Sequence, residues 1–113
     1  TGGVAEIRIV PCMNLDVMLE YFPRPAVVKI DVEAAELRVL EGGNRMLREV
    51  RPIIHCEVAS ETSLEVTALL SHASYRLWSA ADLARGTQEE IRFATDNTVA
   101  IPVERVDEVL SRS

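Results

Sequence analysis

Lysine, aromatic residues and cysteine are scarce in this 113-residue chain, and each shortage excludes a class of protein. Lys29 is the only lysine among 12 basic residues, and the net charge is −6. The chain therefore lacks the basic face of a nucleic-acid binder and the polybasic patch of a membrane-surface protein. Cys12 and Cys56, with two histidines, are too few for a disulfide scaffold or a zinc knuckle. We expect a reduced, cytoplasmic protein with no metal site.

Long apolar runs are missing as well. No apolar stretch approaches the ~18–20 residues that a membrane span needs, so we expect no membrane helix. The start, Thr1-Gly2-Gly3-Val4, has neither an initiator methionine nor a signal peptide, which suggests a segment of a longer chain. Hydrophobic residues make up 48% and charged residues 27%, as in a globular domain. The length predicts a single domain over residues 1–113.

Apolar periodicity predicts strands and helices in alternation. Residues 26–32 are short, β-branched and almost wholly apolar, like a central parallel strand covered on both faces. Thr62-x-x-Glu65 has the pattern of a capping box, and it precedes a helix whose apolar face lies within residues 66–73. The expected strands are 6–10, 26–32, 52–58 and 75–78, and the expected helices are 14–22, 34–41, 44–50 and the one after Thr62.

The last third of the chain follows a different pattern. Residues 80–90 predict an irregular connection with at most one helical turn. Residues 90–94 and 98–101 predict the two arms of a hairpin, and Pro102 then permits a short helix. That helix would turn three side chains inward: Val103, Val106 and Leu110. The whole pattern implies βαβ units and a mostly parallel sheet, which the hairpin makes mixed.

Ionisable side chains lie in two of the predicted strands, at positions that share a face. Lys29 and Asp31 alternate along one strand, and His55 and Glu57 along the next. If these strands are neighbours in register, the four groups meet near one face of the sheet. Asp31 and Glu57 would then lie at carboxyl ends of strands, where open α/β sheets bind ligands. On this interpretation Asp31 and Glu33 hold a ligand or polarise a hydroxyl, and Glu57 positions a partner.

Structural interpretations of the same residues remain open. Lys29 would be buried and neutralised by Asp31 or Glu57, because an unpaired buried charge is costly. His55 would be a hydrogen-bonded core histidine. Cys56, which faces the opposite way, would be a small buried hydrophobe. The acidic run of the following helix would be mostly a solvated face: Glu33, Glu36 and Glu41.

Residues 28–36 read Val-Lys-Ile-Asp-Val-Glu-Ala-Ala-Glu, and Leu40-Glu41-Gly42 follow. This stretch resembles the FkbM family of S-adenosylmethionine-dependent methyltransferases. That family carries lysine-hydrophobic-aspartate-valine-glutamate-glycine-alanine-glutamate, then a leucine and a glycine. Further segments resemble the family in the right order and spacing, over roughly residues 7–102. They are Leu15-Asp16, a leucine-aspartate helix start; Arg51-Pro52-Ile53-Ile54 to Glu57, the next strand; and Asn97 to Pro102, the closing strand.

The sequence departs from the family at two glycines and in one absence. Ala34 and Ser74 stand where the family has glycine, and alanine at position 34 crowds a ligand at the helix start. The resemblance implies a seven-stranded Rossmann-like fold with a glycine-rich loop after its first strand and an acidic, ribose-holding residue ending its second. Nothing before Ala26 can be either element. We therefore expect an incomplete Rossmann-like α/β methyltransferase fold, whose mixed sheet keeps the fourth to seventh family strands with flanking helices.

For the intact parent, the resemblance implies methyl transfer from S-adenosylmethionine to a hydroxyl oxygen of a sugar or secondary metabolite. The residues expected to serve catalysis are Asp31, Glu33, His55 and Glu57, with Asp31 also contacting the cofactor. This chain alone would be inactive and would bind no cofactor tightly. Strand 26–32, without its usual neighbour, would pair with a second copy or with a missing N-terminal segment.

Two alternatives remain at this point. The chain could be a degenerate half-domain that serves as an oligomerisation or interaction module, which Ala34 and the missing loop favour. An unrelated flavodoxin-like binding domain is the weaker alternative, because it needs a phosphate-binding loop that the sequence lacks.

Overall fold

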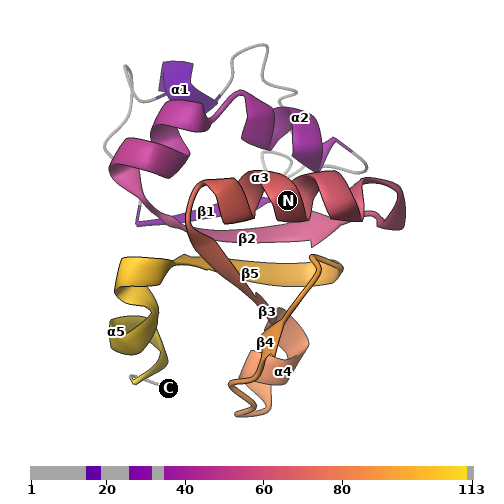
Figure 1. Cartoon of the computed structure of the whole chain (residues 1–113), viewed down its shortest axis with the longest axis vertical. Coiled ribbons are helices and arrows are strands. Elements are labelled where there is room, and N and C mark those ends of the chain that lie inside the picture. Colours follow the sequence, from indigo (N-terminus) through magenta and orange to yellow (C-terminus); the bar gives the residue numbers. More distant parts are fainter. Residues whose placement is uncertain (1–14, 19–25, 32–34, 112–113) are drawn as a thin grey trace, which may run out of the picture.

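The computed structural model describes residues 15–18, 26–31 and 35–111, which form an α/β unit with one five-stranded mixed sheet (Figure 1). This architecture is compatible with a Rossmann-like fold. The strands are β1 (Val27–Ile30), β2 (Ile53–Val58), β3 (Tyr75–Ser79), β4 (Glu90–Ile91) and β5 (Asp96–Pro102). The helices are α1 (Leu15–Met18), α2 (Glu36–Glu41), α3 (Ser63–His72), α4 (Ala80–Ala84) and α5 (Val106–Leu110), with a π-helical turn at Met46–Val50.

The strand order in the sheet is β1-β2-β5-β3-β4, so the last strand of the chain lies in the middle. β1 and β2 are parallel, β5 is antiparallel to both β2 and β3, and β4 is antiparallel to β3. The expected mixed sheet is confirmed. The expectation of mostly parallel pairing is wrong, because three of the four pairs in the described sheet are antiparallel. The expected hairpin is wrong too, because β4 and β5 pair with opposite edges of β3 and not with each other.

β5 occupies the centre because its side chains suit burial on both faces of the sheet. Thr98, Ala100 and Ile101 are fully buried, whereas Asp96 at its start is exposed. The Thr98 hydroxyl also closes the turn before the strand, since it donates to the Thr95 carbonyl and accepts from the Thr95 N–H. Pairing with β2 and β3, which are distant in sequence, thus decided the position of this strand.

Helices cover both faces of the sheet in a three-layer arrangement. α1, α2 and α3 lie on one face, and α4 and α5 lie on the other (Figure 1). The larger core cluster lies under the first group and includes Leu40, Ile54 and Leu70, and the smaller surrounds Trp78 and Ile101. Each such buried side chain contributes roughly 1.5–3 kcal/mol through removal of apolar surface from water. The two clusters therefore fix both faces of β2 and β5.

The helices agree with the periodicity in most places. α2 ends at Gly42 as expected, the turn through Val50 forms with π geometry, and α4 supplies the one helical turn after β3. α3 buries Val66 and Leu70 on its expected face.

Two details of the helix predictions are wrong. The Thr62 hydroxyl accepts no capping hydrogen bond from α3; it donates to the Glu36 carboxylate instead, at an Oγ1–Oε1 distance of 2.5 Å. Val103 is 45% exposed and does not face inward. A 3-10 turn at Val103–Arg105 intervenes before α5, so Val106 is the residue that enters the core.

Arg51 joins several elements at the side where β2 begins. It ends the π-helical turn in a left-handed conformation, φ 60° and ψ 50°. Its guanidinium forms two hydrogen bonds of 2.9 and 2.8 Å with the Glu104 carboxylate and lies 4.9 Å from the centroid of the Tyr75 ring. It also donates to three carbonyl oxygens, those of Leu47, Ala73 and Ser74.

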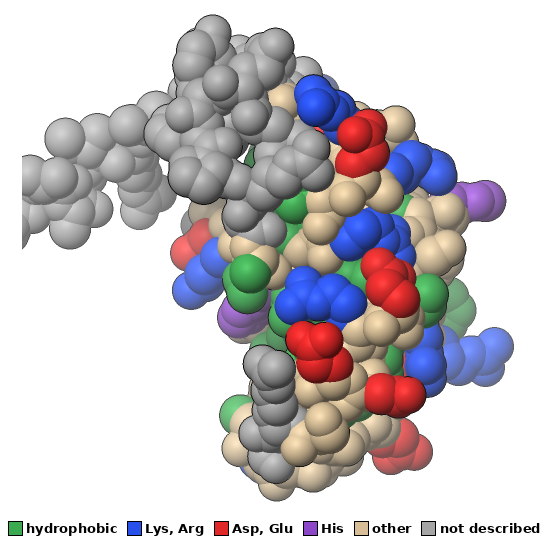
Figure 2. Space-filling view, turned by 90° about the vertical axis from the view of Figure 1, so that its left-hand side faces the viewer, with side chains coloured by type: hydrophobic (Ala, Val, Ile, Leu, Met, Phe, Trp, Pro, Cys, Tyr) green, Lys and Arg blue, Asp and Glu red, His purple; other side chains and the backbone are tan. Residues whose placement is uncertain are grey.

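Basic and acidic side chains are interleaved on the face seen in Figure 2.

Some predictions fall on residues that the structure does not describe. The strand expected at 6–10, Cys12, Glu33 and Ala34 lie outside the described residues, as does the helix expected at 14–22 apart from α1. The single partial domain over residues 1–113 therefore stays a prediction. Within the described ranges, no helix has both the length and the apolar character that a membrane span requires.

Candidate functional site

β1 and β2 bring the predicted site residues to one edge of the sheet. The two strands are parallel, and Lys29 lies opposite His55 in their register. Because side chains alternate, Lys29, His55 and Glu57 share the face that carries α4 and α5. Asp31 directly follows the last residue of β1. The condition for the expected site, that the two strands are neighbours in register, is met.

The charged side chains at this edge are open to solvent. Lys29, Asp31 and Glu57 are all exposed. None of the ion pairs within the described residues involves any of the three. The interpretation of Lys29 as a buried, neutralised charge is therefore wrong. β1 pairs on one side only among the described strands, and Val27 and Lys29, which share one of its faces, are both exposed.

His55 differs from the satisfied core histidine that the sequence suggested. Its side chain is half-buried beside Val99, its partner on β5. Its Nε2 atom is buried and has no hydrogen-bond partner. One nitrogen of the histidine is thus shielded from water.

Cys56 behaves as the small buried hydrophobe that was expected. It is 1% exposed and faces the α2/α3 side of the sheet. Burial, together with the negative charge of Glu36, raises the pKa of its thiol to about 12. The thiol is therefore protonated at neutral pH, which makes it a poor nucleophile.

Glu36, at the start of α2, is a buried acidic residue near this edge that sequence reasoning did not single out. It was expected on a solvated face, yet it is fully buried. Its Oε1 accepts hydrogen bonds from the Ala59 N–H at 3.0 Å and from the Thr62 hydroxyl, while its Oε2 is buried without a partner. The signal was present, because Glu36 shares a helical face with the buried Leu40, four residues on.

The Glu36 carboxylate stays ionised although it is buried. Burial alone raises its pKa, but hydrogen bonds from Thr62 and Ala59 outweigh this effect, and the net pKa lies below its usual value. These bonds tie the start of α2 to the loop that follows β2. Glu36 thereby holds together the same edge that presents Asp31 and Glu57.

The described residues do not make a complete nucleotide-cofactor site. Such a site needs a glycine-rich turn from a strand into a helix. Gly42-Gly43 instead follows α2, and Gly86 follows α4. No group of three histidine, cysteine, aspartate or glutamate side chains in the described part of the chain is arranged to hold a metal ion. The groups that this edge of the sheet presents are the exposed carboxylates of Asp31 and Glu57 and the partly shielded imidazole of His55.

Comparison with known protein families assigns the chain to one family. The family model for the methyltransferase FkbM domain matches residues 1–77. The match spans more than half of the 113 residues, and the chain belongs to the FkbM methyltransferase domain family. Searches of curated proteins and of solved structures gave no significant match. β4, β5 and the helices α4 and α5 follow the matched region, so only the structure places them.

Proposed function

We propose that this chain is the C-terminal part of an S-adenosylmethionine-dependent methyltransferase that O-methylates a sugar or a secondary metabolite. The observation that carries the proposal is the pair of exposed carboxylates, Asp31 and Glu57, at the carboxyl ends of neighbouring parallel strands. Both residues lie in the region that matches the family. S-Adenosylmethionine, when bound to the intact parent, supplies an electrophilic methyl group.

Each predicted site residue has a distinct part in this proposal. Asp31 and Glu57 accept a hydrogen bond from the acceptor hydroxyl and orient its oxygen, and positioning of this kind lowers the barrier to transfer. Asp31 also contacts the cofactor in the parent. Glu33 lies in the same family-like stretch, residues 28–36, and we assign it the same role of orienting the acceptor hydroxyl. His55 is the alternative proton acceptor, but its shielded Nε2 makes the two exposed carboxylates better placed.

The proposal includes the inactivity of this chain by itself, because its described residues lack the cofactor loop. Isothermal titration calorimetry of the 113 residues with S-adenosylmethionine should show no tight binding. Tight binding would contradict the claim that the cofactor half lies elsewhere.

Activity is tested in the longer parent polypeptide, which we expect to bind the cofactor. There, Asp31→Asn and Glu57→Gln should lower methyl transfer to a hydroxyl acceptor without loss of folding. Glu65→Gln on the exposed face of α3 is the matched control. Equal rates of methyl transfer in all three variants would show that Asp31 and Glu57 take no part in the reaction.

A second candidate function is an oligomerisation module, in which β1 pairs with a second copy or with a missing N-terminal segment. It is favoured by the single pairing of β1 among the described strands and by Val27, which is 56% exposed. Lys29 opposes it, because an exposed lysine on an edge strand discourages pairing. Sedimentation velocity decides: association that rises with concentration and falls in Val27→Lys supports the module, and a monomer at all concentrations contradicts it.

A further inference from the structure

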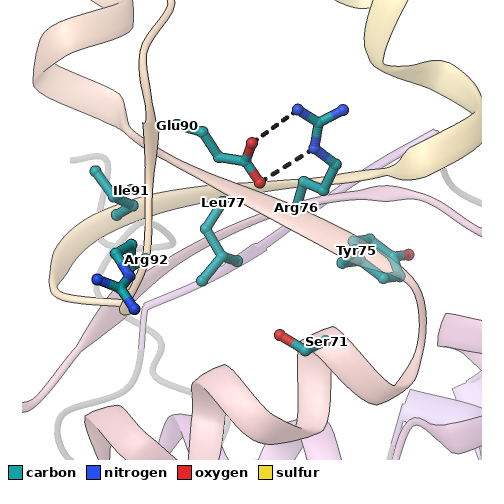
Figure 3. A pocket seen from close by; sticks show the side chains of 7 residues that line it. All are labelled: Ser71, Tyr75, Arg76, Leu77, Glu90, Ile91 and Arg92. Atoms are coloured by element: carbon teal, nitrogen blue, oxygen red, sulfur yellow. Dashed lines mark hydrogen bonds and ion pairs between the residues drawn. The ribbon is translucent and has the colours of Figure 1, made fainter.

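A pocket of about 430 Å³ lies at the outer edge of β3, away from the carboxylates of β1 and β2 (Figure 3). Ser71 of α3, Tyr75 and Arg76 of β3, and Glu90 and Arg92 at β4 all contribute to its wall. No residue of β1 or β2 lines it. Its volume is within the range of small-molecule sites, roughly 300–1,000 Å³.

The two arginines of this pocket differ in their partners. Arg76 forms a two-pronged pair with Glu90, with nitrogen–oxygen distances of 3.1 and 2.7 Å, so its charge is neutralised. Arg92 forms no ion pair within the described residues, and its guanidinium lies over the Phe93 ring, 6.0 Å from the centroid. The wall therefore carries one uncompensated positive charge in a chain whose net charge is −6.

The backbone of β3 adds a hydrogen-bond donor to the same pocket. The Val103 N–H bonds the Ser74 carbonyl, and hydrogen-bonded positions alternate along an antiparallel pair. The N–H of Tyr75 therefore points away from β5, toward the outer edge. β4 covers that edge only at Leu77 and Trp78, so the Tyr75 N–H has no strand partner.

We propose that this pocket binds a small organic anion, a carboxylate or a phosphate monoester. Three of its lining residues supply donors: the guanidinium of Arg92, the hydroxyl of Ser71 and the N–H of Tyr75. Figure 3 shows Ser71 and Arg92 on the α3 side of β3, whereas the Arg76–Glu90 pair closes the opposite side. Charge-assisted hydrogen bonds of this kind favour an anion over a neutral ligand. The proposal does not depend on methyl transfer or on the carboxyl edge.

The test is an NMR titration of the full chain at constant ionic strength with four probes. The probes are inorganic phosphate, phenyl phosphate, benzoate and, as the neutral comparison, phenol. We expect saturable shifts at the amides of Ser71, Tyr75 and Arg92 with the anionic probes and none with phenol. The stronger response to phosphate or to carboxylate identifies the group that the pocket prefers.

Matched variants separate a site from general charge attraction. Arg92→Gln should weaken the binding of the responding probe about tenfold, because it removes a charge-assisted hydrogen bond. Arg38→Gln, an exposed arginine on α2, should leave binding unchanged. Ser71→Ala should weaken it less and gives a second test if Arg92→Gln disturbs the fold. Unsaturable shifts, shifts spread over the exposed arginines, or full binding by Arg92→Gln and Ser71→Ala would each overturn the proposal.

Discussion

At the scale of single residues, Glu36 is a charged side chain that the described structure buries fully. Its carboxylate accepts hydrogen bonds from the part-buried Ala59 N–H and Thr62 hydroxyl. Removal of the acceptor therefore costs more than the net contribution of the two hydrogen bonds, because part-buried donors are left unpaired.

We expect Glu36→Ala to destabilise the fold by roughly 3 kcal/mol, through two unpaired donors and a cavity. Glu36→Gln should cost less, because its amide oxygen can still accept both bonds. Urea unfolding measures both values, with the exposed Glu65→Gln as control. Equal stability of Glu36→Ala and the unchanged chain would show that these hydrogen bonds contribute nothing net.

Glu104 sets part of the response to acid. Hydrogen bonds from Arg51 lower its pKa from 4.5 to about 2 in the folded chain. Its stabilising effect is therefore complete above about pH 4.5 and is lost as the pH falls toward about 2. The Glu104 side chain is 50% exposed, so solvent screening keeps the effect below about 1 kcal/mol.

The free energy of unfolding should accordingly fall less between pH 7 and pH 3 in Glu104→Gln than in the unchanged chain. The remaining slope comes from other carboxyl groups with lowered pKa values, including Glu36 and Glu90. Urea titrations at the two pH values provide the measurement. Identical slopes would mean that the Arg51–Glu104 pair persists in the unfolded chain or adds no stability.

At the scale of elements, α1 is held to the rest of the fold through Asp16. Its carboxylate accepts from the Arg45 N–H at 2.8 Å and the Met46 N–H at 2.7 Å, and its own N–H bonds the Gly42 carbonyl. Gly43 permits this contact, because an added Cβ would lie 2.8 Å from Leu15 Cδ1. The helix start near residue 44 is thus capped from a distant segment, which no local pattern could predict.

Loss of this cap should be measurable. We expect Asp16→Ala to lower stability by about 1–2 kcal/mol, the usual effect of a lost helix cap. The Arg45 and Met46 amides should then exchange with deuterium faster than in the unchanged chain. Glu41→Ala, an exposed residue of α2, controls for surface charge. Unchanged protection of the two amides would show that α1 docks without its carboxylate.

At the scale of the whole molecule, the position of β5 makes the fold depend on its C-terminal third. β5 is the only described strand that joins β2 to β3, so the sheet divides without it. The family match ends at residue 77, yet the matched part cannot close its own sheet.

A chain truncated after residue 95 should therefore fail to fold cooperatively. The truncated chain loses the pairing of β5 with β2 and with β3. It also loses the burial of Thr98, Ala100 and Ile101. Circular dichroism and thermal unfolding test this, and removal of residues 111–113 is the control that should keep the transition. A cooperative transition in the chain of 95 residues would show that β2 and β3 can pair directly.

Local patterns determined much of this protein. Short apolar runs located β1, β2 and β3, helical spacing of apolar residues located α3, and the lysine-aspartate-glutamate motif identified the family. The sequence placed Lys29 and His55 on neighbouring strands only as a condition, and the structure supplies the register that sets them opposite each other. The roles of Asp31, Glu33, His55 and Glu57 stay predictions.

Only the tertiary structure decided the place of β5, the burial of Glu36 and the exposure of Lys29. Each depends on a contact between segments that are far apart in the sequence. The Thr62 hydroxyl could cap its own helix or bond Glu36, and β5 could fold back on β4 or enter between β2 and β3. Sequence periodicity reports which side chains are apolar, but the choice between such partners is made by packing, which removes both partners from water at once.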